Sequence, residues 1–355
     1  MFCRYGGQSS TGIVCAESVD PISQATVDAL KRILGPEALQ PKVPLARYTA
    51  FRIGGPADLL AVVHDVVSLR RVVALAWDQG LPCRVLGGGT NILVSDAGVR
   101  GLVMLNRARK TVFIPGGEGK SAAQAGAGRA TEPEWIARAE SGASLSALAR
   151  QCVARGLAGL EWAAGIPGTV GGAVVGNAGA WGGDVASTLR AATVLNPDGT
   201  EARWPVDRFR YGYRTSILKA TATAGPPAGG SIRRAVVLEA DFGLVGGNRE
   251  ALRARVAEIT ARRSASQPPG ATCGSVFKNP PGDSAGRLIE AAGLKGRRVG
   301  GAEISEVHAN FIVNLGQARA ADVKALIDLA RNTVQVLFGI SLELEIELVG
   351  DWEKR

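Results

Sequence analysis

Apolar residues at helical spacing mark amphipathic helices along most of the chain. The spacing predicts helices over Pro21–Gly35, Ser68–Gly80, Ser144–Gly156, Asn248–Arg263, Ser284–Ala292 and Ala321–Phe338. Capping residues support several of the ends: Ser144 stands where an N-cap belongs, and Gly80 and Gly293 follow the last apolar position of their helices. The local sequence therefore indicates both the helices and several of their boundaries.

Shorter apolar runs between these helices predict strands. The runs are Leu59–Val63, Pro82–Leu86, Ile92–Val94, Gly98–Leu105, Leu189–Asn196, Thr200–Trp204, Ile232–Leu244, Gly274–Pro280, Val299–Ile304 and Phe311–Val313. Pro197-Asp198-Gly199 is a strong turn signal and predicts a hairpin between the two strands that flank it. The mixture predicts an α+β protein, whose C-terminal part packs helices on a small sheet.

The last predicted strand, Leu342–Val349, alternates strictly between apolar and acidic residues. One face would carry Leu342, Leu344, Ile346 and Leu348, and the other Glu343, Glu345 and Glu347. A charged strand face exposed to water is the ordinary interpretation of such a pattern. Periodicity alone gives the three glutamates the same environment and does not choose among them.

The stretch Gly165–Asp184 is unusually rich in glycine and has almost no charge. Its glycines are Gly165, Gly168, Gly171, Gly172, Gly176, Gly179, Gly182 and Gly183. Glycine inside a regular element costs roughly 0.5–1 kcal/mol relative to alanine, so this composition needs a reason. A flexible linker is one interpretation, but such linkers are mostly Gly and Ser, whereas Val and Ile are interleaved here. We therefore favour a loop system whose backbone lies close to a ligand.

A second glycine cluster, Gly87-Gly88-Gly89-Thr90-Asn91, joins two apolar runs. Backbone N–H groups at such a turn form a nest for phosphate oxygens. No GxGxxG precedes a helix, and no Gly-Lys-Ser/Thr follows, so neither the Rossmann nor the P-loop pattern applies. A tight hairpin connection explains this cluster about as well as a phosphate site does.

Composition and charge narrow the class of protein. The chain has 355 residues, enough for roughly two or three domains. The net charge of +9 suits either nucleic acid or a small anion such as a nucleotide diphosphate. The Lys and Arg residues are scattered and no RNA-binding aromatic motif occurs, which favours the small anion.

The cysteines and the apolar runs exclude several other classes. The five cysteines are odd in number and form no CxxC pair, and only His64 and His308 accompany them, so we expect no metal site. Free thiols in a reducing compartment fit this usage best. No apolar run is long enough to span a membrane, and the first twenty residues lack a secretory apolar core. We read them as a loose extension, and Lys110–Glu132 as a mobile low-complexity insertion.

Several motifs occur in one order along the chain. They are FRIGGPAD, LGGGTNILVSD, LEWAAGIPGTVGGAVVGNAGAWGGD, YRTSILK, GSVFKNP, AGRLIEAAGLKG, HANFIVN and LELEIELVG. In this order they resemble the UDP-N-acetylenolpyruvoylglucosamine reductase family, over roughly Leu45–Gly350. GSVFKNP runs almost directly into PGDSAGRLIE, which is similar to the shorter family form that lacks an extra tyrosine-bearing loop.

The resemblance implies an architecture. It consists of a two-lobed FAD-binding region of the vanillyl-alcohol-oxidase type, followed by a smaller α+β substrate-binding domain. On this basis we expect an N-terminal extension (1–40), a first FAD lobe (41–105), a second lobe (106–263, with the insertion at 110–132) and a C-terminal domain (264–355). The last boundary coincides with SASQPPGA, Ser264–Ala271, which reads as a linker.

The resemblance also implies a reaction. NADPH would reduce a non-covalent FAD, which would pass hydride to the enolpyruvyl group of a UDP-sugar and complete UDP-N-acetylmuramate for peptidoglycan. Arg214 matches the family's catalytic arginine, Ser275 the serine that protonates the substrate, and Glu345 its C-terminal glutamate. From the residues alone, Arg208, Arg210 and Arg214 are equally visible, and Ser275 reads as a turn serine.

Binding residues follow from the same matches. The resemblance assigns to the flavin Arg52, Ile53, Gly54, Gly87, Gly88, Gly89, Thr90, Asn91, Gly165, Ile166, Pro167, Gly168, Gly171, Gly172, Asn177 and Gly179. It assigns to the substrate Tyr213, Lys278 and Asn279. The chain departs from the family pattern at Val175, Gly176, Trp181 and Leu344.

Other classes of protein remain as alternatives. Another FAD-dependent oxidase of the same superfamily would share the lobes but lack GSVFKNP and LELEIEL. An inactive flavin- or nucleotide-binding module would lack the catalytic residues, and a basic nucleic-acid binder would show steep salt dependence. We expect a cytoplasmic enzyme, monomeric, with no nucleic-acid partner and no membrane insertion.

Overall fold

The computed structural model describes residues 22–116, 133–219 and 233–352. Its helices are α1 (Gln24–Leu34), α2 (Val66–Asp78), α3 (Leu145–Ala154), α4 (Val170–Gly176), α5 (Val185–Thr188), α7 (Arg249–Ser266), α8 (Ala285–Ala291) and α9 (Ala320–Phe338). Short 3-10 turns lie at Pro36–Ala38, Leu45–Tyr48, Glu161–Ala163 and Val206–Phe209. Every predicted helix is present, and the Ser144 hydroxyl caps α3 by accepting from the Ala147 N–H.

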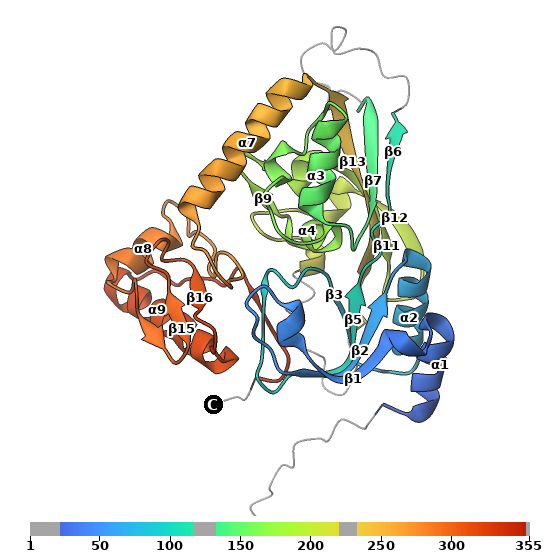
Figure 1. Cartoon of the computed structure of the whole chain (residues 1–355), viewed down its shortest axis with the longest axis horizontal. Helices are drawn as coiled ribbons and strands as arrows, with labels where there is room; N and C mark the ends of the chain where they lie inside the picture. The colour runs from blue at the N-terminus through green and yellow to red at the C-terminus, as the bar shows by residue number, and fades with distance from the viewer. Residues whose placement is uncertain (1–21, 117–132, 220–232, 353–355) are drawn as a thin grey trace, which may run out of the picture.

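A four-stranded sheet forms the first lobe. Its order is β1 (Leu39–Pro44), β2 (Pro56–Val63), β5 (Val99–Asn106) and β3 (Cys83–Leu86), antiparallel at β1–β2 and parallel elsewhere. Helices α1 and α2 pack on one face, and Leu30 of α1 is fully buried there (Figure 1). Residues 24–40, placed by sequence in the extension, therefore pack as part of this lobe, while residues 1–21 lie outside the described residues.

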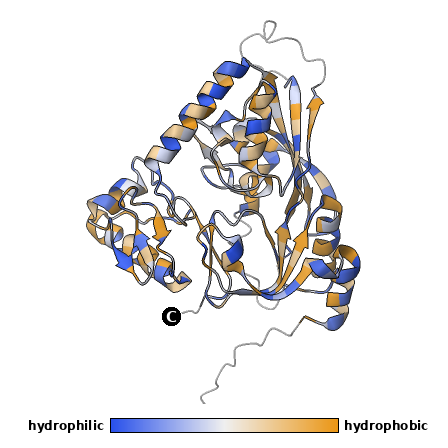
Figure 2. Ribbon diagram, in the orientation of Figure 1, coloured by the Kyte–Doolittle hydropathy of each residue, from blue (hydrophilic) through white to orange (hydrophobic). Residues whose placement is uncertain are grey.

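An antiparallel sheet forms the second lobe. Its order is β12 (Glu201–Pro205), β11 (Leu189–Leu195), β13 (Val236–Gly246), β7 (Trp135–Glu140) and β6 (Thr111–Pro115), and β8 (Leu157–Ala158) joins the end of β13. Helices α3 and α4 share its core, and Figure 2 shows both hydrophobic and polar residues along its strands. The hairpin predicted around Pro197-Asp198-Gly199 is confirmed.

The predicted insertion at 110–132 begins too early. Thr111–Pro115 forms β6, and its full length pairs with β7, which the sequence did not reveal. Thr111 and Phe113 lie opposite Ala139 and Ala137, two fully buried positions of the core. The alanines of β7 give a weak strand pattern in the sequence. The pairing of β6 with β7 is therefore evident only from the structure. The remainder, 117–132, lies outside the described residues.

The C-terminal part is a small α+β unit. Strands β14 (Arg298–Val299), β15 (Ala302–Ile304) and β16 (Ile312–Asn314) form its sheet, which packs with α8 and α9. Helix α7 runs along the second lobe and leads into this unit (Figure 1). The helix continues to Ser266, beyond the linker start predicted at Ser264.

The end of the chain returns to the first lobe. Strand β17 (Glu347–Val349) pairs in parallel with β4 (Ile92–Val94). The strands on either side of Gly87–Asn91 therefore belong to different sheets, and the hairpin interpretation of that cluster is wrong. Phe51, Ile53 and Leu93 of the first lobe also pack in the C-terminal core. The α+β class is confirmed, and none of the described helices is long and apolar enough to cross a membrane.

Candidate active site

Two glycine-rich segments from different lobes meet backbone to backbone. A Cβ on Gly87 would collide with the Thr169 hydroxyl, and one on Gly88 would lie 3.0 Å from the Gly168 Cα. The Thr90 hydroxyl donates to the Pro167 carbonyl at 3.4 Å. We call the segments 87–91 and 167–172 the glycine cradle. This contact leaves no room for a side chain at Gly87 or Gly88, which explains glycine at these two positions.

The first lobe also closes one side of the cradle. Gly89 has a φ of 61°, and a Cβ there would collide with the Tyr48 carbonyl. The Gly89 carbonyl accepts from the Ala50 N–H at 2.9 Å. Nearby, Arg52 also has a left-handed backbone, with φ at 55°, and the Ile53 carbonyl accepts from the Thr49 hydroxyl. The predicted residues Arg52–Gly54 thus follow directly on the segment that supports Gly89.

The stretch Gly165–Asp184 is ordered structure, so the linker interpretation is wrong. It contains α4, and the Gly171 N–H near the start of this helix donates to the Ser141 carbonyl at 2.8 Å. A Cβ on Gly171 would press on Ser141, whereas Gly172 is open to ordinary contact and Gly176 has nothing within 4 Å. Packing therefore demands only some of these glycines, and the rest leave the surface of α4 bare.

Other residues of the stretch also make packing contacts outside the cradle. Gly165 faces the side chain of Arg263 on α7, and Ile166 packs on the core of the second lobe. Gly179 lies against Asp184, across the small β9 (Gly179–Ala180) and β10 (Gly183–Asp184) hairpin. Trp181, one of the departures from the family pattern, sits in the turn of that hairpin with φ at 55°.

The segment 211–216 is tied to the C-terminal turn of α4 by three hydrogen bonds. The Tyr211 hydroxyl donates to the Val174 carbonyl at 2.9 Å, and the Ser216 hydroxyl donates to the Val175 carbonyl at 2.5 Å. The Asn177 amide donates to the Gly212 carbonyl at 3.0 Å. Val175 contributes a backbone atom here, so its departure from the family pattern leaves this contact intact.

Arg214 stands at the tip of this tied segment. Gly212 and Thr215 pair across it, and its own φ is 56°, a conformation that costs a non-glycine residue roughly 1–2 kcal/mol. Asn177 is left-handed as well, with φ at 46°. Backbone strain of this kind clusters at functional sites, where the surrounding structure holds it in place.

Arg214 forms an ion pair with Glu345. The Arg214 Nε donates to Glu345 Oε1 at 2.8 Å, and the two side chains are 25% and 16% exposed. Burial raises the pKa of Glu345 above its usual value, although the positive charges of Arg214, Lys219 and Lys278 oppose the shift. The pair joins the second lobe to the C-terminal segment, and two of the three predicted catalytic residues are therefore in contact.

The backbone of Glu345 is fixed from three sides. Its N–H donates to the Val276 carbonyl at 2.9 Å, and its carbonyl accepts from the Asn91 amide at 3.0 Å and the Lys219 ammonium at 3.1 Å. Asn91 thereby links the glycine cradle to the ion pair. Ser275 adjoins Val276 and pairs with Phe311, and its hydroxyl has no hydrogen-bond partner among the described residues.

The three glutamates of the final segment do not share one face, contrary to the predicted alternating strand. Glu343 is 76% exposed and pairs with Lys278, while Glu347 pairs with Arg84 of β3. The backbone pairs with Val276 at Glu345 and with Asn91 at Glu347. The segment bends at residues 345–346 between these two partners, and only Glu345 pairs with Arg214.

Two of the three predicted substrate residues, Tyr213 and Lys278, lie near this pair. Tyr213 is largely exposed, and the Arg214 guanidinium carbon lies 5.5 Å from its ring centroid. The Asn279 side chain accepts from the Ala285 N–H at the start of α8 at 3.1 Å, so part of its capacity is used structurally. Lys278 bonds to Glu343, and no bond to Ser275 occurs among the described residues.

Sequence reasoning missed Lys219. It closes the YRTSILK motif, but nothing in its spacing marked it, because its contacts are to backbone carbonyls of distant segments. Its ammonium donates to the carbonyls of Arg214 and Glu345. The only available signal was its membership of the motif that carries Arg214.

The cradle fits the diphosphate of a dinucleotide cofactor. Gly87, Gly88 and Gly89 carry no side chains and pack closely on Thr169, Gly168 and Tyr48, and α4 adds an open surface without a side chain at Gly172. Backbone N–H groups at such positions bind phosphate oxygens without a clash from a Cβ. A flavin ring bound next to this surface would lie beside the segment that carries Arg214.

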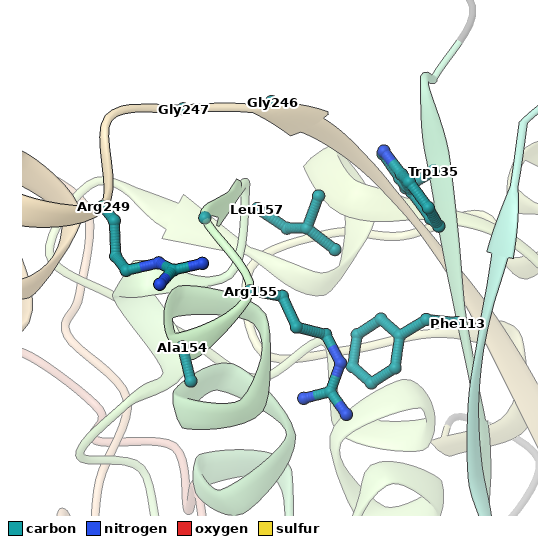
Figure 3. Close-up of a pocket in the computed structure, with 9 residues that line it drawn as sticks. Phe113, Trp135, Ala154, Arg155, Leu157, Gly246, Gly247 and Arg249 are labelled. Carbon is teal, nitrogen blue, oxygen red and sulfur yellow. The ribbon is translucent and has the colours of Figure 1, made fainter.

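A separate cavity of about 720 Å³ lies at the far end of the second lobe. Figure 3 shows Arg155 stacked beside Phe113, with Trp135 and Arg249 nearby. None of the predicted site residues lines it. Its position at β6, β7 and the start of α7 separates it from the Arg214–Glu345 pair, so this cavity is not the candidate active site.

The described thiols are chemically quiet. Burial raises the pKa of Cys83 to about 11 and that of Cys152 to about 12, and burial also raises the pKa of Cys273. A thiol with a raised pKa carries little thiolate at neutral pH, and thiolate is the reactive form. Within the described ranges, no group of His, Cys, Asp and Glu is arranged to hold a metal ion.

Known proteins match the chain over most of its length. Residues 266–349 match the family described as UDP-N-acetylenolpyruvoylglucosamine reductase, C-terminal domain, and residues 57–204 match an FAD binding domain. A UDP-N-acetylenolpyruvoylglucosamine reductase of Chloroflexus aggregans is 45% identical over 314 residues, covering 88% of this chain and 98% of the relative. One from Symbiobacterium thermophilum is 46% identical over 321 residues, covering 90% and 94%.

A solved structure agrees with these matches. The UDP-N-acetylenolpyruvylglucosamine reductase of Thermus caldophilus superposes with a TM-score of 0.67 at 36% identity, covering 88% of this chain and 98% of that one. The chain therefore belongs to the UDP-N-acetylenolpyruvoylglucosamine reductase family, and it is a flavoprotein oxidoreductase of peptidoglycan synthesis that uses FAD.

Proposed function

We propose that the protein uses NADPH to reduce the enolpyruvyl group of UDP-N-acetylglucosamine enolpyruvate, which yields UDP-N-acetylmuramate. Bound FAD would accept hydride from NADPH and deliver hydride to the vinyl carbon of the substrate. The chain must then stabilise negative charge beside the substrate carboxylate and supply a proton to the α-carbon. The observation that carries the proposal is the Arg214–Glu345 ion pair, held next to the Ser275 segment and linked to the cradle by Asn91.

Arg214 is suited to the stabilising role. A guanidinium stays charged at any working pH and binds a carboxylate in a fork. Its Nε is engaged by Glu345, which fixes the plane of the group and leaves the terminal nitrogens to face a substrate carboxylate. A fixed cation where charge develops is often the largest single contribution to catalysis. Glu345 orients that cation in this proposal.

Ser275 is the proposed proton donor. Its hydroxyl has no hydrogen-bond partner within the described part of the chain, so a substrate would be its first. The Ser275 O–H bond would break, and the proton would form the new C–H bond at the α-carbon. A serine is a weak acid, so the step needs the strongly basic carbanion formed by hydride addition as its driving force.

Binding roles extend the proposal. The cradle residues Gly87–Asn91 and Pro167–Gly172, together with Arg52–Gly54, Gly165, Ile166, Asn177 and Gly179, would hold FAD. Tyr213, Lys278 and Asn279 would contact the UDP-sugar. The division into two FAD lobes and a C-terminal substrate domain belongs to the same proposal. The cytoplasmic location and the monomeric state stay predictions.

Rapid mixing of the two half-reactions tests the proposal. Oxidised protein mixed with NADPH should lose its flavin absorbance, and reduced protein mixed with the enolpyruvyl sugar nucleotide should regain it. Ser275→Ala should leave the first step within about twofold and slow the second by about 10²–10⁴-fold, the usual contribution of a general acid. Ser266→Ala, at a serine whose hydroxyl bonds only to the Arg263 carbonyl, is the matched control. Protein that binds no FAD, or equal losses in both steps, would refute the assignment.

An oxidase of the same superfamily is the alternative of the same chemical class. The flavin of such an enzyme would be reduced by a small alcohol and reoxidised by molecular oxygen, and the enzyme would ignore the sugar nucleotide. The C-terminal match over residues 266–349 favours the reductase, because this segment supplies both Ser275 and Glu345. If the protein were an inactive binding module or a nucleic-acid binder, neither function would require the strained Arg214 turn or its ion pair with Glu345.

A further inference from the structure

Lys219 is the one described cation that bonds to the backbones of both Arg214 and Glu345. Its Nζ lies 3.2 Å from the Arg214 carbonyl and 3.1 Å from the Glu345 carbonyl. These two carbonyls belong to different parts of the fold, one to the strained turn of the second lobe and the other to the bent C-terminal segment. One ammonium therefore spans the joint across which the ion pair forms.

The lysine is itself fixed. Its N–H donates to the Ser216 hydroxyl at 3.3 Å, and the same hydroxyl donates to the Val175 carbonyl at the end of α4. The side chain starts from a helical turn that begins at residue 217. Movement of Lys219 relative to α4 would break these bonds. They therefore hold Lys219 in place against α4, the helix whose open glycine surface is proposed to face the flavin.

The partly buried position of Lys219 disfavours its charged form. Burial lowers the pKa of Lys219, the Glu345 and Glu347 charges oppose this, and Lys278 and Arg214 add to it. No salt bridge within the described ranges includes Lys219; its bonds go to neutral carbonyls. A partly buried charge without a bonded carboxylate weakens a fold unless its hydrogen bonds offset the lost hydration. This unfavourable placement suggests that the role of the Lys219 ammonium is to position the two carbonyls to which it bonds.

We propose that Lys219 is a positioning residue, which holds the carbonyls of Arg214 and Glu345 at a fixed separation so that guanidinium and carboxylate meet in the reactive arrangement. The inference rests on the proposed roles of Arg214 and Glu345. Its consequence is specific to the second half-reaction, in which the charge beside the substrate carboxylate develops. Flavin reduction by NADPH does not need this arrangement.

The charge of Lys219 has a second consequence at Glu345. The groups that face the Glu345 carboxylate are Arg214, Lys219 and Lys278, all of which favour its ionised form against burial. Removal of the Lys219 charge therefore raises the pKa of Glu345. The pH at which flavin reoxidation loses activity through protonation of Glu345 would move upward, whereas loss of packing alone would leave that pH unchanged.

Lys219→Met and Lys219→Gln test the proposal in the full-length, FAD-loaded protein. Methionine keeps the apolar stem without the charge, and glutamine keeps N–H donors on a shorter, neutral side chain. Both should slow reoxidation by the enolpyruvyl sugar nucleotide by about 10–100-fold, since a misplacement of about 1 Å costs up to about 10²-fold. Both should move its acidic limb to higher pH and leave NADPH-driven flavin reduction within about twofold.

Lys295→Met is the matched control. Lys295 is similarly shielded and pairs with Glu290 in the C-terminal unit, away from the site. It should change neither half-reaction nor the pH profile. An unchanged reoxidation rate and pH limb in the Lys219 variants would overturn the inference. So would equal losses in both half-reactions, or variants that both fail to fold, because either result makes Lys219 a general structural residue. Absence of sugar-nucleotide turnover in the unmodified protein would instead refute the proposed function.

Discussion

The Arg214 Nε and the Glu345 Oε1 lie 2.8 Å apart, although 131 positions separate the two residues in the sequence. Arg214 reaches this position from a left-handed turn, and Glu345 reaches it from a segment that bends between two backbone partners. Neither residue is in an ordinary helix or strand. The left-handed backbone of Arg214 is unfavourable by itself, and the meeting of the two residues depends on the tertiary structure around them.

Glu345→Gln tests whether the Arg214–Glu345 ion pair is required, rather than any negative charge among the glutamates of this segment. The amide oxygen still accepts from Arg214 but carries no negative charge, so the ion pair is lost and we expect flavin reoxidation by the sugar nucleotide to fall by about 10²–10³-fold. Glu343→Gln, at an exposed position two residues away, should change that rate by less than about twofold. Both rates come from absorbance after rapid mixing. Similar effects of the two substitutions would contradict the unique role of Glu345.

Arg210 and Arg214 allow a test of backbone strain. Both have positive φ, at 46° and 56°, and lie in one short segment, but Arg210 is exposed and caps a 3-10 turn. Glycine relieves the strain, so Arg210→Gly should raise the free energy of unfolding by about 0.5–1 kcal/mol, offset in part by entropy of the unfolded chain. Urea unfolding measures this. Arg214→Gly should abolish reoxidation by substrate, and retained activity there would exclude Arg214 as the stabilising cation.

Two bare glycines of α4 test the placement of the flavin. A Cβ on Gly172 would come no closer than 3.6 Å to another protein atom, the Thr169 hydroxyl oxygen, and one on Gly176 would meet nothing within 4 Å. Alanine therefore fits the protein at both positions, but only Gly172 is assigned to FAD. We expect Gly172→Ala to weaken FAD binding by about tenfold, measured by fluorescence titration of the apoprotein, because a methyl group displaces the ligand by about a bond length. Gly176→Ala should bind FAD normally and gain about 0.5–1 kcal/mol of stability from helix propensity. If Gly176→Ala weakened FAD binding and Gly172→Ala did not, the flavin would lie nearer Gly176 than we propose.

Asp241 on β13 gives the stability a defined pH dependence. Its carboxylate is 2% exposed and bonds to Arg138 and Arg203. Burial alone would raise the pKa of Asp241, but the hydrogen bonds from the two arginines outweigh burial and lower it. A lowered folded pKa gives stability that is fully present above the unfolded value, near 3.9, and is lost as pH falls through the folded value.

Asp241→Asn removes this contribution. It should cost about 1.5–3 kcal/mol at pH 7, because the charge-assisted hydrogen bonds are lost while the two partly exposed guanidinium groups remain hydrated. The difference from the unmodified protein should stay constant between about pH 6 and 8 and shrink below about pH 4. Denaturant unfolding across pH measures it. Asp198→Asn, at an exposed turn, is the control, and a difference that grows toward low pH would reverse the assigned sign.

The helices were predictable because their determinants are local. The stripe Leu69, Val72, Val73 and Ala76 faces the first-lobe core, and Gly80 follows the helix with a left-handed φ of 62°. Ser284 and Asn248 accept from N–H groups of the first turn of α8 and α7. In each case spacing and capping chemistry act within a few residues, so the sequence contains the full physical cause.

Strand partners and site contacts were not local in this sense. β6 and β7 have weak patterns and become strands because each satisfies the other's backbone groups. The cluster Gly87–Asn91 read equally well as a hairpin or a phosphate nest, and only the assignment of β3 and β4 to different sheets removed the hairpin. Strand pairing depends on backbone hydrogen-bond partners in a distant segment, and the local sequence of a strand does not identify that segment.

By itself the sequence determined the family, the amphipathic helices and the identity of the motifs that carry Arg214, Ser275 and Glu345. The tertiary structure decided which of three similar glutamates meets Arg214, why Arg214 differs from Arg208 and Arg210, and that Lys219 joins the two. The physical reason is that side-chain type and periodicity are properties of a segment. Burial, ion pairing and the pKa of Glu345 arise from contacts between segments far apart in the chain.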